Sequence, residues 1–262
     1  MPPRHASAQR SDDLPPASVP GAAHHDPSGT GPAAPPPRRG GGLAAWLRET
    51  FLIVGSALVL SLLIKTFLVQ AFFIPSSSME PTLLIGDRVL VNKLAPGPFE
   101  MNRGDIVVFK DPGGWLPPSQ DPPQPAWREA LTTGLTFIGL VPQDSGEHLI
   151  KRVVGLPGDV VECCDEAGRL TVNGVPLDEE YLAPGSRPSE IEFTAVVPTS
   201  GVWVMGDNRQ NSQDSRYKQG DPGGGSIPVE NVVGVSFVTV WPIDRWSVIR
   251  SAGSTFEQVP EP

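Results

Sequence analysis

The chain has 262 residues, a formal net charge of −9 and two cysteines, which are adjacent at Cys163 and Cys164. This composition excludes a disulfide-rich scaffold and a zinc site built from several cysteines. Residues 1–75 carry six basic and four acidic side chains, so residues 76–262 carry 14 basic and 25 acidic ones. Because nucleic-acid affinity comes from Lys and Arg neutralising phosphates, this acidic part argues against a DNA or RNA partner.

Residues 1–42 form a tail with 10 Pro, 6 Gly and no aromatic side chain. Such a stretch buries too little apolar surface to offset the chain entropy that is lost on folding. We therefore expect a disordered tail.

An almost wholly apolar stretch follows, and we expect a transmembrane helix over residues 43–71. The uncharged run Thr50–Ile64 is 15 residues long, and as a helix it covers about 22 Å of the ~30 Å hydrocarbon core. Extension to Gln70 gives a full span but includes Lys65, whose amine can reach the interface by snorkelling. The alternative is a helix buried in a protein core.

The flanks of this stretch predict its orientation. Arg38, Arg39 and Arg48 lie at its N-terminal end, so the positive-inside rule predicts a single-pass protein of the cell membrane with a cytoplasmic N-terminus and an extracytoplasmic remainder. A cleaved signal peptide ending near Val69–Ala71 is a competing interpretation. The long tail and the interruption by Lys65 favour an uncleaved anchor.

The fold class expected for the rest is mainly β, with a folded domain over residues 72–250 and a flexible C-terminus over 251–262. Runs rich in Val and Ile are bounded by Gly or Pro, which is typical of short strands. An Asn-Gly pair between apolar residues predicts a hairpin over Leu170–Leu177. The other predicted strands are Asp87–Val91, Asp105–Phe109, Leu149–Val154, Val202–Met205 and Val232–Trp241.

Residues 113–147 are interpreted as an insertion between two strands. Its first part, Gly113–Pro125, is rich in Pro and predicts a loop. Trp115, Trp127 and Phe137 either pack within the loop or touch the membrane interface, where Trp is enriched.

The inventory of reactive side chains narrows the chemistry. Three of the four histidines lie in the tail, and His148 has no motif around it that suggests a Ser-His-Asp triad. The sequence has no His cluster, no HExxH, no GxGxxG and no P-loop, so we expect no metal and no cofactor. A hydrolase of this composition would pair Ser with Lys.

Lys151 is the candidate base of such a pair. In the strand Leu149–Val154, period-two alternation gives Lys151 and Arg152 opposite faces, and both faces also carry aliphatic side chains. One cation must therefore enter apolar surroundings or meet a partner. Burial lowers the pKa of a Lys, whereas an Arg keeps its proton. The alternative is a Lys at an exposed strand edge.

Two polar segments complete the candidate chemistry. Pro75–Thr82 holds three serines between prolines, and its composition alone favours a flexible loop. Gly206–Arg216 is dense in side chains that form hydrogen bonds. Ser215 and Lys218 fit an SxxK pattern, but the SDN and KTG motifs of β-lactamases are missing.

These segments, in this order behind one apolar stretch, resemble the bacterial type I signal peptidases. The resemblance covers roughly residues 45–245 and rests on four boxes. Ser77 and Gln210 depart from the pattern, since many members have Gly and Asp there. The boxes are Pro75–Thr82, Gly86–Val91, Lys151–Asp159 and Gly206–Arg216.

The resemblance implies a role for each matching residue. Ser78 would be the nucleophile and Lys151 the general base, while the Ser76 hydroxyl and the Ser78 backbone N–H would form the oxyanion hole. Ser212 would orient the Lys151 amine. The supporting polar network would consist of Arg152, Asp207, Arg209, Asp214 and Arg216. The substrate-binding residues would be Phe72, Ile74, Pro75 and Met79.

The family further implies a membrane-anchored serine endopeptidase with a coiled antiparallel β catalytic domain and a small β cap at about residues 160–200. It would remove N-terminal signal peptides after small residues at positions −3 and −1. The expected partners are preproteins and membrane lipid, with the secretion translocon nearby.

Three alternatives stay open. The first is a self-cleaving repressor with a Ser-Lys pair, against which the anchor and the acidic domain argue. The second is a catalytically silent binding module whose tail binds cytoplasmic partners. The third concerns Cys163 and Cys164, which form either a vicinal disulfide or two packed thiols.

Overall fold

The structure is a computed structural model that describes residues 42–116, 125, 127–128 and 147–262. The predicted tail over residues 1–42, apart from its last residue, and most of the predicted insertion, including Phe137, lie outside these ranges. Within them, Trp115 is buried and packs edge-on against Phe109, whereas Trp127 is exposed.

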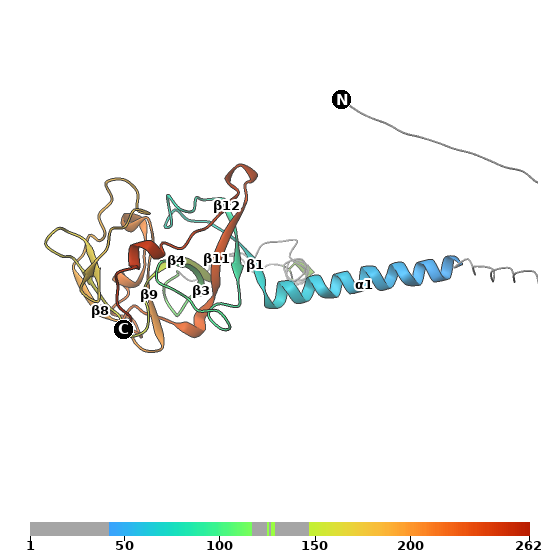
Figure 1. The fold of residues 1–262 in the computed structure, drawn as a ribbon, viewed down its shortest axis with the longest axis horizontal. Coiled ribbons are helices and arrows are strands. Elements are labelled where there is room, and N and C mark those ends of the chain that lie inside the picture. The colour runs from blue at the N-terminus through green and yellow to red at the C-terminus, as the bar shows by residue number, and fades with distance from the viewer. Residues whose placement is uncertain (1–41, 117–124, 126, 129–146) are drawn as a thin grey trace, which may run out of the picture. The chain divides into compact units, whose positions relative to one another are not determined.

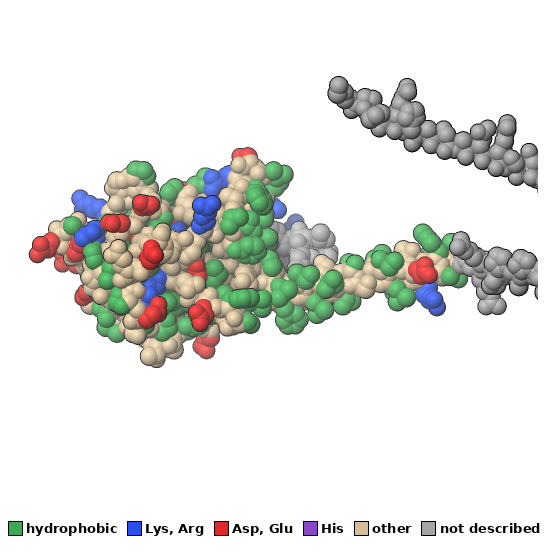
Figure 2. Space-filling model, in the orientation of Figure 1, with side chains coloured by type: hydrophobic (Ala, Val, Ile, Leu, Met, Phe, Trp, Pro, Cys, Tyr) green, Lys and Arg blue, Asp and Glu red, His purple; other side chains and the backbone are tan. Residues whose placement is uncertain are grey.

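One α-helix, α1 (Leu43–Phe67), lies in the apolar stretch. Its part Leu43–Ile64 is long and apolar enough to cross a membrane, and none of it is buried against protein. Figure 2 shows hydrophobic side chains along its length. This exposure argues against a buried core helix and fits a membrane anchor. The helix ends at Phe67 rather than at the predicted residue 71, because the chain from Val69 onward pairs as a strand.

The larger sheet has eight antiparallel strands in the order β1-β2-β11-β3-β4-β9-β10, with β12 paired to β11 (Figure 1). Each strand is antiparallel to its neighbours, so the fold is mainly antiparallel β as expected. The strands are β1 (Val69–Phe73), β2 (Arg88–Asn92), β3 (Ile106–Lys110), β4 (His148–Gly155), β9 (Gly201–Met205), β10 (Ile227–Pro228), β11 (Val232–Trp241) and β12 (Ser247–Val248).

A smaller sheet lies within the range expected for the cap and has the order β7-β6-β5-β8. The predicted hairpin is confirmed: Val172 pairs with Val175, and the two loop residues Asn173 and Gly174 both have positive φ, as a type I′ turn requires. The strands are β5 (Val160–Cys163), β6 (Leu170–Val172), β7 (Val175–Pro176) and β8 (Phe193–Val196).

The described residues after β9 include five short 3-10 helices. One lies inside the polar segment Gly206–Arg216 and a second begins in it, so this segment has defined backbone structure. They are η1 (Arg209–Asn211), η2 (Ser215–Tyr217), η3 (Val229–Asn231), η4 (Ile243–Arg245) and η5 (Gly253–Phe256).

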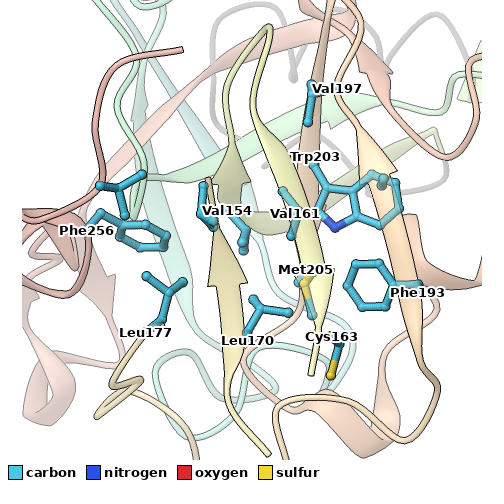
Figure 3. Packing of buried hydrophobic residues seen from close by; sticks show 13 residues of the cluster. Val154, Val161, Cys163, Leu170, Leu177, Phe193, Val197, Trp203, Met205 and Phe256 are labelled. Atoms are coloured by element: carbon cyan, nitrogen blue, oxygen red, sulfur yellow. The ribbon is translucent and has the colours of Figure 1, made fainter. Parts of the chain in front are cut away.

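A hydrophobic core joins the two sheets. Trp203 from β9 stacks on Phe193 from β8, and Val161 and Met205 pack around them (Figure 3). The same cluster takes in residues near the C-terminus, among them Phe256.

The C-terminal segment 251–262 was expected to be flexible, but in the structure it is docked on the domain. Phe256 and Val259 are buried in the core. The Arg103 guanidinium also donates a hydrogen bond of 3.2 Å to the Pro260 carbonyl oxygen. The two apolar side chains remove surface from water, which outweighs the polar character of the segment.

The two adjacent cysteines lie at the end of β5. Cys163 is buried in the core and Cys164 is exposed. Their sulfur atoms are joined in a vicinal disulfide, which is one of the two states that the sequence leaves open.

Candidate active site

Lys151 lies on β4 in the middle of the larger sheet and is only 4% exposed. Its Nζ lies 2.7 Å from the Ser78 Oγ and 3.0 Å from the Ile150 carbonyl oxygen. Arg152 on the opposite face is also buried, but it is paired with a carboxylate. Both cations therefore enter the domain interior, and among the described residues Lys151 forms no ion pair.

Burial has a direct effect on the protonation of this amine. Desolvation disfavours the ammonium form and lowers the pKa of Lys151 from 10.5 to about 8, while the carboxylates of Asp214 and Asp207 act in the opposite direction. An amine with this pKa is partly neutral near pH 7, and a neutral amine can accept a proton from a hydroxyl group.

Ser78 lies in a tight turn between β1 and β2. The Glu80 N–H donates to the Ser77 carbonyl oxygen over 3.1 Å, and the Leu83 N–H donates to the Met79 carbonyl oxygen over 2.9 Å. Ser78 is 7% exposed. The Ser76 side chain is exposed, and its Oγ lies 3.4 Å from the Ser78 Oγ. The turn thus brings Ser76 and Ser78 together, as the resemblance implies.

The segment Gly206–Arg216 packs directly on this turn. The Asn208 N–H donates to the Ser78 carbonyl oxygen over 3.1 Å, and its side-chain amide donates to the Ser77 carbonyl oxygen over 3.0 Å. The Asn211 amide donates to the Ser77 hydroxyl oxygen over 2.6 Å. Asn208 and Asn211 were not predicted as site residues, because a polar residue in a polar loop carries no signal of its contacts.

Buried ion pairs stabilise the segments that surround Ser78 and Lys151. Arg152 donates to both oxygens of Asp207, over 2.8 and 2.6 Å, and Thr82 donates to the same carboxylate over 2.5 Å. Arg216 binds both oxygens of Asp214 over 2.8 and 2.9 Å. Bidentate pairs of this kind fix orientation as well as charge. The structure therefore brings Arg152, Asp207, Asp214 and Arg216 into the polar network expected for them.

Arg209 joins the network through a partner that the sequence does not reveal. It binds both oxygens of Glu179, over 2.8 and 2.5 Å, and donates to the Gly206 carbonyl oxygen over 3.0 Å. Beside Glu179, the Tyr181 ring lies 4.1 Å from the Arg152 guanidinium carbon. Glu179 and Tyr181 follow the hairpin of the smaller sheet and lie in no motif, so nothing in the sequence connects them to this site.

Ser212 is close to the site but not bonded to the amine. Its Oγ is buried and has no hydrogen-bond partner among the described residues, so the predicted contact with Lys151 is not present in the structure. Gly206 allows the Ser212 hydroxyl and the Ser78 carbonyl oxygen to pack closely against its backbone. A Cβ added there would meet the Ser212 hydroxyl and lie 2.5 Å from the Ser78 carbonyl oxygen.

The residues predicted to bind substrate differ in their exposure to solvent. Phe72, Ile74 and Met79 are buried in one hydrophobic cluster with Ile150, the neighbour of Lys151. Pro75 is exposed. The cluster therefore contains the chain neighbour of Ser78, Met79, and the chain neighbour of Lys151, Ile150. In the described ranges, no three His, Cys, Asp or Glu side chains gather as metal ligands.

The profile of the family described as "Signal peptidase, peptidase S26" matches residues 47–241. The probable signal peptidase I of Mycobacterium leprae is 36% identical over 238 residues, covering 80% of this chain and 81% of that protein. Signal peptidase I of Mycobacterium tuberculosis (strain CDC 1551 / Oshkosh) is 39% identical over 225 residues, covering 78% and 76%.

A more distant relative shows the same relationship. Signal peptidase I P of Bacillus subtilis subsp. natto is 30% identical over 216 residues, covering 79% of this chain and 94% of that protein. The profile match includes the Ser78 turn, β4 with Lys151, and the polar segment packed on both. The chain therefore belongs to the signal peptidase family, peptidase S26.

Proposed function

We propose that this chain is a membrane-anchored endopeptidase that removes N-terminal signal peptides from exported preproteins, with Ser78 as nucleophile and Lys151 as general base. The observation that carries the proposal is the 2.7 Å distance between the Ser78 Oγ and the Lys151 Nζ inside the protein. The lowered pKa of Lys151 supports its role, and the relatives named signal peptidase I support the substrate class.

In the proposed first step, neutral Lys151 takes the Ser78 proton while the Ser78 oxygen attacks the carbonyl carbon before the scissile bond. The resulting ammonium then protonates the departing nitrogen, so that the mature protein leaves as an amine and the signal peptide stays on Ser78 as an ester. In the second step, Lys151 takes a proton from water while the hydroxide attacks the ester carbon. The Lys151 ammonium then returns that proton to the departing Ser78 oxygen, and the signal peptide leaves as a carboxylic acid that ionises in water.

Negative charge develops on the carbonyl oxygen in both steps. We assign its stabilisation to the Ser76 hydroxyl and the Ser78 backbone N–H. The 3.4 Å distance between the two serine oxygens supports this assignment, because it puts the Ser76 hydroxyl beside the attacked carbonyl. Donors fixed in position before the reaction contribute strongly to such steps.

We assign the preference for small residues at −3 and −1 to the apolar side of the site. Phe72, Ile74 and Met79 are each at most 2% exposed, so their cluster is already filled by the protein's own side chains. Because this surface is already packed, a substrate side chain can lie against it only if that side chain is small. Exposed Pro75 would border the bound chain beside them.

We place the N-terminus in the cytoplasm and the β domain outside. Arg38, Arg39 and Arg48 precede or begin the helix α1, which fits the positive-inside rule. Anchoring in lipid would hold the site beside the inserted apolar core of a signal peptide and close to the translocon that delivers it.

The test is cleavage of a preprotein with an Ala-x-Ala site by the full chain in detergent. The wild type is expected to give one new N-terminus directly after that site, identified by mass spectrometry. Ser78→Ala is expected to lower the rate by at least about 1,000-fold, as removal of a nucleophile does in other serine peptidases. An unchanged circular dichroism spectrum is the control. Wild-type activity in a folded Ser78→Ala variant would overturn the proposal.

Gly206→Ala should reduce cleavage without touching any reacting group. The added Cβ would meet the Ser212 hydroxyl and the Ser78 carbonyl oxygen, so the turn that carries Ser78 must shift. A misplacement of about 1 Å lowers rates by roughly 100-fold. The measurement is kcat on the same preprotein, with Gly220→Ala as the control, because Gly220 is exposed, has no positive φ, and its Cβ would meet nothing within 4 Å. Equal effects of the two changes would contradict the explanation.

A further inference from the structure

A pocket lies beside the turn that carries Ser78. It is an open pocket of about 380 Å³ between the turn after Ser78, the cap loop Ala183–Ser186 and the polar segment with Asn208 and Gln210. None of the residues assigned above to catalysis or to the −3 and −1 positions lines it. What binds in this pocket is therefore not explained by the roles assigned so far.

The contacts of Asn208 place this pocket next to the nucleophile. Asn208 lines the pocket, and its backbone N–H is bonded to the Ser78 carbonyl oxygen. The turn also separates two consecutive side chains: Met79 is fully buried in the apolar cluster, whereas Glu80 lines the pocket. The turn that carries Ser78 thus contributes one neighbouring side chain to the cluster and the next one to the pocket.

This placement determines which half of a substrate reaches the pocket. In the proposed reaction, the residues before the scissile bond lie over the apolar cluster and the carbonyl carbon lies at Ser78. A chain bound in extended form continues past the nucleophile, so the residues after the scissile bond leave the site on the other side. The pocket is the space that the structure offers them there.

The pocket also has a charge. Glu80 is its one ionisable lining residue, and no hydrogen bond or ion pair of its carboxylate is recorded among the described residues. The other polar groups are the amides of Asn208 and Gln210 and the Ser186 hydroxyl. A carboxylate in a partly open pocket attracts a cationic side chain and repels an anionic one.

We infer that this pocket binds the first residues of the mature chain and that Glu80 makes it favour a basic over an acidic side chain there. The inference rests on the proposed function. It makes Glu80 a specificity-determining residue on the leaving-group side, distinct from the groups that select small residues before the scissile bond.

The experiment uses preproteins with one Ala-x-Ala site that carry Lys or Glu at the first, second or third mature position. The ratio of kcat/KM for Lys over Glu is measured with the full chain in detergent. At one position the wild type should favour Lys by about two- to fivefold, the size expected of a solvent-exposed ion pair. High salt should bring the ratio toward one, because ions screen such a pair.

Three variants at two positions report on the pocket. Glu80→Gln should bring the ratio to about one, and Glu80→Lys should reverse it. Gln210→Lys, at an exposed position in the same pocket, should lower the ratio without altering the turn. The matched control is Glu166→Gln, an exposed acid outside the pocket, which should leave the ratio unchanged.

The outcomes separate the two proposals. A wild type that cleaves none of the preproteins overturns the proposed function and this inference with it. A wild type that cleaves all of them, with a ratio that neither Glu80→Lys nor Gln210→Lys changes, overturns only the inference.

Discussion

Lys151→Met should abolish signal-peptide cleavage and at the same time stabilise the fold. The loss of activity follows from removal of the proposed base, which typically contributes 100- to 10,000-fold to a rate. The gain in stability follows from burial: the unfolded chain keeps this amine protonated in water, whereas the folded protein holds its pKa at about 8.

The size and sign of the stability change follow from that pKa. A shift from 10.5 to about 8 corresponds to roughly 3 kcal/mol of destabilisation by the charged amine. The penalty is fully present below pH 8, decreases between pH 8 and 10.5, and is absent above. Met fills a similar volume but loses the contacts with Ser78 and the Ile150 carbonyl oxygen. We therefore expect a net gain on the order of 2 kcal/mol at pH 7.

Urea unfolding and kcat/KM of the same Lys151→Met preparation test this prediction together. Lys110→Met is the control, since Lys110 is exposed on β3 and should change the free energy of unfolding by less than about 0.5 kcal/mol. A Lys151→Met variant that still cleaves the preprotein would contradict the catalytic role, and one that unfolds at lower urea than the wild type would contradict the burial penalty on Lys151.

Asp207→Asn should be the most destabilising single change in the polar network. Asp207 is fully buried and accepts hydrogen bonds from Arg152 and Thr82. The Asn side chain keeps the shape but leaves the buried Arg152 charge without a counter-ion. Breaking a buried pair in this way costs about 3–5 kcal/mol, because the remaining charge stays out of water.

The free energy of unfolding measures that loss. Asp178→Asn is the matched control: Asp178 is 85% exposed and lies 3.8 Å from Arg169, so its pair contributes at most about 1 kcal/mol. If Asp207→Asn lost no more than Asp178→Asn, the network would not hold the site as described.

Local patterns predicted much of the fold. Alternation of side chains along Leu149–Val154 placed Lys151 and Arg152 on opposite faces and required one of them to be buried or paired, and the structure buries both. The Asn173-Gly174 pair predicted its hairpin because few residues other than Gly and Asn adopt positive φ. Each of these signals lies within a few residues of the structure it predicts.

What the sequence did not predict depends on contacts between distant segments. Glu179 meets Arg209 only because the smaller sheet brings the chain back to the polar segment. The docking of Phe256 and Val259 depends in the same way on a core assembled from both sheets. The bond expected between Ser212 and Lys151 came from resemblance, and the structure leaves the Ser212 hydroxyl without a partner. The pocket beside Glu80 is formed by three segments that no motif connects.

The dependence of kcat/KM on pH tests the central claim most directly, because it reports the pKa of the base in the free enzyme. The wild type is assayed on the Ala-x-Ala preprotein between pH 6 and 11.5. The account predicts a rate that rises with pH through an apparent pKa of about 8, the value expected for buried Lys151, with activity at pH 7 about tenfold below the plateau. A rise centred near 10.5, the ordinary value of a lysine amine in water, would contradict a desolvated Lys151 as the general base.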